Sequence, residues 1–87
     1  MYSRCLFIHS SRVGDRVVLF RSDTQVTIVL NPTGSQIWEL LEVPQSPSAL
    51  AAQLVSKYPM LSADQAAADV ASFLAQMFDN GFVGLET

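Results

Sequence analysis

Hydrophobic residues in the first third of the chain gather in short stretches that polar segments separate, a pattern typical of β-strands. Residues 4–9 and 16–20 are apolar and rich in strand-forming side chains, and residues 10–15, which include a glycine, predict a loop between them. Residues 25–30 form a third stretch, with β-branched side chains at four consecutive positions. Because the connections are short, we expect the three strands to form an antiparallel meander.

The remaining two thirds of the chain have the hydrophobic period of helices, and helices are predicted at residues 32–41, 47–58 and 63–79. Each is preceded by a residue that favours the N-cap position: Asn31, Ser46 and Ser62. The predicted buried faces are Ile37, Leu40 and Leu41; Leu50, Leu54 and Tyr58; and Ala66, Ala67, Val70, Phe73, Leu74, Met77 and Phe78. Residues 82–85 form a short apolar tail that we expect to pack back on the bundle.

This order of elements predicts an α+β fold: a three-stranded antiparallel sheet followed by a three-helix, winged-helix-like bundle. The 87 residues suffice for one small domain, residues 1–87, and a composition of 49% hydrophobic and 15% charged residues argues against disorder. The apolar runs are far shorter than the ~20 residues that span a bilayer. We therefore expect no membrane partner and a cytoplasmic location.

The charge of the chain disfavours nucleic acid as the main partner. The formal net charge is −3, with a balance of +2 over residues 1–30 and −5 over residues 31–87. A winged-helix transcription regulator is the alternative to weigh, but it needs a basic recognition helix. The second predicted helix carries only Lys57, and the third carries no lysine or arginine.

The sequence contains no convincing catalytic constellation. His9 is the only histidine and has no neighbours at metal-ligand spacing, so we expect neither a metal nor another cofactor. Cys5 is the only cysteine, which excludes an internal disulfide, and it lies in an apolar strand where a thiol is usually a small hydrophobe. We expect no catalytic residue and no enzymatic activity.

The third predicted strand has an unusual edge. In a three-stranded meander the last strand has one unpaired side, and natural proteins usually protect such an edge with charge or proline. Residues 24–30 contain neither. Two readings stay open: the C-terminal tail of this chain covers the edge, or the edge accepts a strand from another molecule. A second copy of the chain is one such molecule, so a homodimer is also compatible with the sequence.

An ordered set of residues adds a family resemblance. The set is Leu30-Asn31-Pro32-Thr33-Gly34-Ser35-Gln36-Ile37-Trp38-Glu39-Leu40-Leu41, then Ser46, Leu50, Leu54 and Tyr58, then Asp69-Val70, Phe73-Leu74 and Gly81-Phe82-Val83. It resembles the PqqD-like family, the precursor-peptide recognition elements of ribosomal peptide natural-product pathways, over about residues 13–85.

The resemblance implies that the chain is a non-catalytic binding module. Its partner would be the leader segment of a precursor peptide, added as a strand to the third strand and bounded by the third helix. The implied peptide-binding residues are Gln25, Val26, Thr27, Ile28, Val29, Leu30, Ala66, Asp69, Val70 and Phe73. The module would present the precursor to a leader peptidase or other modifying enzyme. A lasso-peptide-type pathway is favoured, and a peptide chaperone of the pyrroloquinoline quinone pathway is the alternative.

Overall fold

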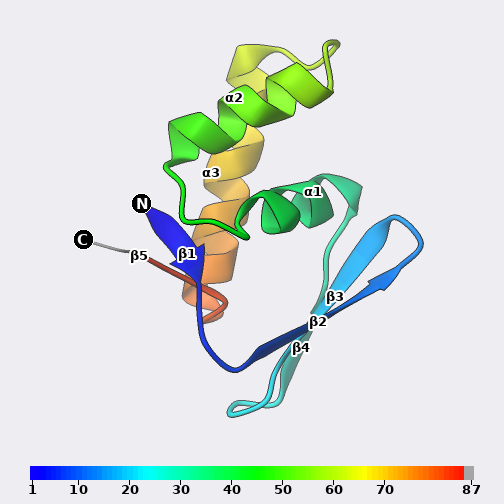
Figure 1. Ribbon diagram of the computed structural model, residues 1–87, viewed down its shortest axis with the longest axis vertical. Helices are drawn as coiled ribbons and strands as arrows, with labels where there is room; N and C mark the ends of the chain where they lie inside the picture. The colour runs from blue at the N-terminus through cyan, green and yellow to red at the C-terminus, as the bar shows by residue number, and fades with distance from the viewer. Residues whose placement is uncertain (86–87) are drawn as a thin grey trace.

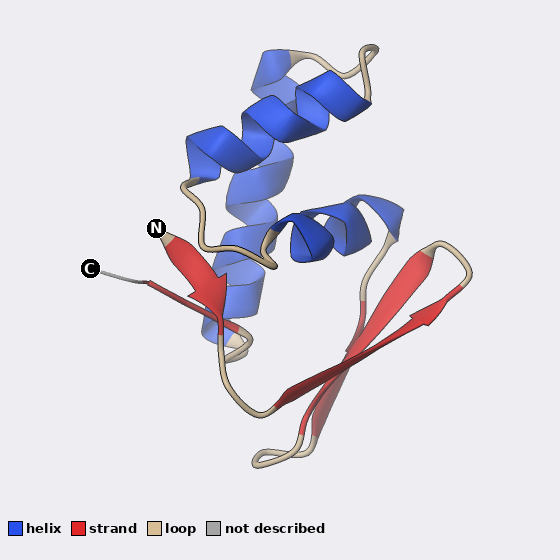
Figure 2. Cartoon of the chain, viewed as in Figure 1, coloured by secondary structure: helices blue, strands red, loops and turns tan. Residues whose placement is uncertain are grey.

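The computed structural model describes residues 1–85, which form three helices and two small antiparallel sheets (Figure 1). The elements, in chain order, are β1 (Tyr2–Arg4), β2 (Ile8–Val13), β3 (Arg16–Arg21), β4 (Val26–Val29), α1 (Pro32–Leu40), α2 (Pro47–Lys57), α3 (Ala63–Asp79) and β5 (Val83–Leu85). The sheet of β2, β3 and β4 projects from the helices as a wing, and β1 and β5 form a second sheet beside α3 (Figure 2). The predicted α+β, winged-helix-like fold is confirmed.

The helices begin where their caps predict. The side chains of the three N-cap residues each accept a hydrogen bond from the backbone three residues later, as this position requires. Asn31 accepts from Gly34 N at 2.7 Å, Ser46 from Ala49 N at 3.2 Å, and Ser62 from Gln65 N at 3.0 Å. In α1 and α2 the next residue is proline, whose missing N–H costs nothing in the first turn.

The core lies where the helices meet one face of the wing. The largest fully buried side chains of the helices and of the α1 C-cap are Ile37, Leu41, Leu50, Leu54, Val70 and Met77, all within the predicted apolar faces. The assignment of Tyr58, Ala67 and Phe78 to those faces was wrong, because all three side chains are exposed. Tyr58 falls on the C-cap of α2, where the chain leaves the helix and its side chain leaves the buried face.

The first predicted strand is in fact two strands. The chain breaks at Leu6 and Phe7, and Phe7 adopts the left-handed region with φ of 66°, which no regular strand tolerates. The predicted loop at residues 10–15 is also mostly strand, because β2 continues to Val13. Nearly all of β2 is exposed, so its residues show none of the alternation that identifies a half-buried strand.

The C-terminal tail does form a strand, but not on the wing. β5 pairs with β1, in a register that places Tyr2 opposite Leu85 and Arg4 opposite Val83. The reading in which the tail covers the edge of the third strand is therefore wrong. Within residues 1–85 the outer edge of β4 has no strand partner.

A buried serine at the start of α1 fixes this helix to β3 and to the segment that follows β4. Val17 N donates to Ser35 Oγ at 2.8 Å, and Leu30 N donates to the Val17 carbonyl at 2.8 Å. The Ser35 hydroxyl also lies 3.4 Å from the Leu30 carbonyl, to which it donates. Ser35 is fully buried, so these bonds satisfy groups that water cannot reach. The wing is consequently held at a defined position relative to the helices.

Arg4 makes the corresponding link between β1 and α1. Its guanidinium donates to the Trp38 carbonyl and lies 4.6 Å from the centroid of the Trp38 ring, in cation–π contact. Burial lowers the pKa of Arg4 from its ordinary value, although the carboxylates of Glu42 and Glu39 act in the opposite direction. Trp38 itself is buried and belongs to the hydrophobic core.

Candidate functional site

Two residues of β4 have backbone N–H and C=O groups that point to the outer edge of the wing, away from β3. In an antiparallel pair, backbone groups of alternate residues point toward the partner strand. Leu30 N donates to the Val17 carbonyl, so Ile28, which pairs with Leu19, also points toward β3. Thr27 and Val29 have the opposite parity, and their N–H and C=O groups therefore point to the open edge.

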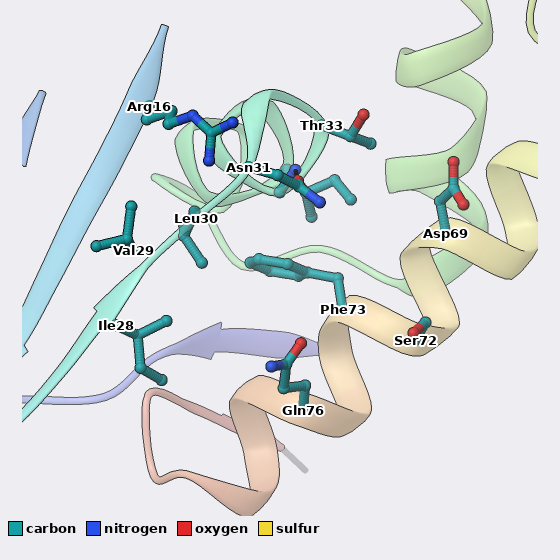
Figure 3. A pocket seen from close by; sticks show the side chains of 12 residues that line it. Arg16, Ile28, Val29, Leu30, Asn31, Thr33, Asp69, Ser72, Phe73 and Gln76 are labelled. Carbon is teal, nitrogen blue, oxygen red and sulfur yellow. Dashed lines mark hydrogen bonds between the residues drawn. The ribbon is translucent and has the colours of Figure 1, made fainter. Parts of the chain in front are cut away.

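A groove of about 360 Å³ runs along this edge between β4, α1 and α3 (Figure 3). Its lining combines residues of the wing, the start of α1 and one face of α3: Arg16, Ile28, Val29, Leu30, Asn31, Thr33, Gly34, Ile37, Asp69, Ser72, Phe73 and Gln76. The side chains of Ile28 and Leu30 point toward Phe73, whereas Val29 points away from it (Figure 3). The groove thus has an apolar floor and a largely polar rim.

Close approach of α1 to α3 forms the floor, and Gly34 permits it. A Cβ atom at Gly34 would lie 3.1 Å from Asn31 Oδ1 and 3.3 Å from two atoms of the Phe73 ring. Such contacts are tighter than ordinary van der Waals packing. A larger residue at this position would push the ring or the N-cap, so the glycine allows Phe73 to face the groove.

Within the described part of the chain, the lining contains one positive and one negative side chain. Arg16 is the first residue of β3, and Asp69 lies on the opposite wall, on α3 (Figure 3). Asp69 Oδ1 accepts a hydrogen bond from Gln65 Nε2 at 2.8 Å. The polar groups Asn31 and Thr33 lie between the two charges.

The residues predicted for peptide binding occupy different places. Ile28, Val29, Leu30, Asp69 and Phe73 line the groove. Exposed Val26 and Thr27 belong to β4 outside this lining, although Thr27 presents its backbone to the open edge.

Three other members of the predicted set do not line the groove either. Gln25 precedes β4 in the left-handed region, with φ of 59°, rather than extending the strand. Ala66 and Val70 are almost fully buried in the core and contribute nothing to the lining, so we do not carry them into the proposed site.

Several groove residues were not predicted. Ser72 and Gln76 follow Asp69 and Phe73 at helical spacing, so a strict helical projection from Asp69 could have found them. Asn31 and Thr33 were treated only as a helix start. Arg16 belongs to a different strand, and no local signal in the sequence places it beside the end of β4.

Cys5 and His9, the two residues weighed for chemistry in the sequence, do not line the groove. No three metal-ligating side chains gather within residues 1–85, and no helix in this part of the chain could cross a membrane. Cys5 is a free, half-buried thiol, and the His9 ring lies 6.3 Å from that of Phe20.

The fold and the groove define a winged-helix-like module in which the unpaired edge of β4 lies beside α3, within the described residues 1–85. The chain belongs to the family described as Coenzyme PQQ synthesis protein D (PqqD), whose sequence profile matches residues 16–83. No curated protein matches the chain.

Two solved structures share the fold over nearly their whole length. One is "TbiB1 in Complex with the TbiA(beta) Leader Peptide", with a TM-score of 0.87, 22% identity, and coverage of 98% of each chain. The other is "Lasso peptide synthetase B1 complexed with the leader peptide", with a TM-score of 0.81, 20% identity, and coverage of 97% of this chain and 98% of that one. At these identities the likeness establishes the fold.

Proposed function

We propose that this chain binds the leader segment of a ribosomally made precursor peptide and catalyses no reaction itself. The leader adds as an extra strand to the outer edge of β4 and lies in the groove beside α3. The observation that carries the proposal is the combination of unpaired backbone groups at Thr27 and Val29 with a groove along the same edge. Strand addition draws affinity from main-chain hydrogen bonds and selectivity from pockets for alternate side chains.

Within residues 1–85 the wing has two free edges, and their difference supports this assignment. β2 carries the charged Arg12, and an edge charge opposes pairing with another strand. β4 contains only Val26, Thr27, Ile28 and Val29, so nothing on it repels an added strand. The same property allows two free copies to pair edge to edge, and such a homodimer stays a prediction.

The bound leader would be presented to a leader peptidase or other modifying enzyme in the cytoplasm. The two structurally similar proteins are both complexes with a leader peptide, and the name of one refers to lasso peptide synthesis. These names support a lasso-peptide-type pathway over the pyrroloquinoline quinone pathway.

A binding assay tests the proposal. The open reading frames on either side of the gene for this chain are searched for a short precursor, and the probe is a fluorescent synthetic peptide that covers its leader. We expect a saturable rise in fluorescence anisotropy with the authentic leader and none with a scrambled peptide of equal composition. Equal binding of the two peptides, or binding of neither, would refute the proposed function.

A further inference from the structure

Arg16 differs from the other basic side chains of the protein. The chain has five lysines and arginines, all within the described residues. Four of them have intramolecular partners: Arg4 with Trp38, Arg12 with Glu39, Arg21 with Asp23, and Lys57 with Gln36. Arg16 has no side-chain partner within residues 1–85, and it lines the groove. This cation is free to interact with whatever occupies the site.

Asp69 is the complementary charge on the facing wall. Among residues 1–85 it is the only acidic residue of the groove lining, and its one side-chain partner there is the neutral amide of Gln65. Figure 3 places Arg16, Asn31, Thr33 and Asp69 toward one end of the groove, with Ile28 and Gln76 toward the other. The two unpaired charges therefore meet the same short segment of an occupant.

The faces of the wing determine which side chains of an added strand meet each charge. Val17 and Leu19 are buried against the helices, so Arg16 belongs to the opposite face of β3, which it shares with Val18. Val29 pairs with Val18 and lies on that outer face, whereas Asp69 projects from α3 on the helix side. Side chains of an added strand alternate between these two faces.

We propose that Arg16 and Asp69 determine the charge pattern of the peptide that this groove accepts. The peptide carries an acidic side chain on the outer face beside Arg16 and a basic side chain on the helix side facing Asp69. Since the two faces alternate, the acidic and basic residues are an odd number of positions apart. This inference rests on the proposed function, and it specifies the substrate class of the same site.

Selection from a displayed library of random twelve-residue peptides tests this pattern without knowledge of the natural precursor. Wild-type protein should enrich peptides with an acidic and a basic residue at odd separation. Arg16→Glu should replace the acidic preference by a basic one, and Asp69→Lys should replace the basic preference by an acidic one. Peptides selected on the wild type should bind Arg16→Glu roughly tenfold more weakly, as expected for reversal of one partly exposed charge pair.

Matched controls separate this local effect from net charge. Lys57→Glu changes the net charge as Arg16→Glu does, and Asp64→Lys changes it as Asp69→Lys does, but neither control residue lines the groove. Both controls should enrich the same peptides as the wild type. Circular dichroism of each variant confirms that it remains folded.

The possible failures are distinguishable. In one outcome, the selected peptides perturb the amide signals of β4, but the wild type, Arg16→Glu and Asp69→Lys all enrich peptides with the same charges. The charge inference is then overturned, and strand addition stands. If the controls alter the preferences as strongly as the groove variants, the inference is likewise overturned. If no selected peptide perturbs β4, the charge inference and the proposed function both fail.

Discussion

Replacement of Thr27 by proline tests strand addition at the backbone itself. Proline removes the N–H of Thr27, which faces the open edge, and places a ring carbon where an added strand would approach. The hydrogen bonds between β3 and β4 are made by the even-numbered residues of β4, such as Ile28. The substitution at Thr27 therefore deletes none of them. The wing should therefore remain folded while its outer edge loses a donor.

The expected loss follows from the number of groups removed. One net amide hydrogen bond is worth about 1 kcal/mol, and displacement of the neighbouring peptide carbonyl adds a similar amount. A loss of about 2 kcal/mol corresponds to a rise in Kd of about thirtyfold. Unfolding free energy should fall by no more than about 1 kcal/mol, because the site is exposed and no ladder bond is lost.

Ser10→Pro supplies the matched control on the other edge of the wing. Phe7 accepts from Ser22 N, so odd-numbered residues of β2 point toward β3 and Ser10 points outward. Both variants remove one outward N–H from an edge strand. Fluorescence anisotropy with the labelled leader should show the thirtyfold loss for Thr27→Pro and no loss for Ser10→Pro. Equal affinities of Thr27→Pro and wild type, with both folded, would refute the reasoning.

Three further predictions concern the junction, the groove and an exposed ion pair. Ser35→Ala should lower the unfolding free energy by about 1–3 kcal/mol, because Val17 N loses its buried acceptor; an unchanged urea midpoint would contradict this. Val29→Glu places a carboxylate in the groove lining and should weaken leader binding at least fivefold in the anisotropy assay with unchanged far-ultraviolet circular dichroism; full affinity would count against strand addition. A hydrogen bond from Arg21 holds the pKa of Asp23 below its ordinary value of 3.8, so the contribution of this pair to stability is present at neutral pH and is lost as the pH falls below that value. The stability difference between wild type and Asp23→Asn should shrink in acid, and a constant difference between pH 7 and pH 2.5 would argue against the pair.

Local signals in the sequence predicted the helices well. N-caps, prolines and apolar spacing act within a few residues, and the structure confirms the starts at Asn31, Ser46 and Ser62. The unprotected edge of the third strand was equally predictable, because the absence of charge and proline is a property of that segment itself. Family resemblance added the expected location of the groove.

Non-local pairing was not predictable in the same way. The break at Phe7 depends on a left-handed backbone at a residue type that rarely adopts it. The pairing of β5 with β1 joins the two ends of the described chain, and short apolar segments do not specify their partners. Arg16 lies in the groove lining because β3 pairs with the segment that leads into α1. No pattern of neighbouring residues in the sequence reveals this pairing.

The most direct measurement of the central claim is amide hydrogen exchange by NMR, with and without the leader peptide. Strand addition predicts that the amides of Thr27 and Val29, which face the open edge, become protected on binding, whereas those of Ser10 and Arg12 on the opposite edge do not. Binding that leaves Thr27 and Val29 unprotected, or that protects Ser10 and Arg12 instead, would contradict the account.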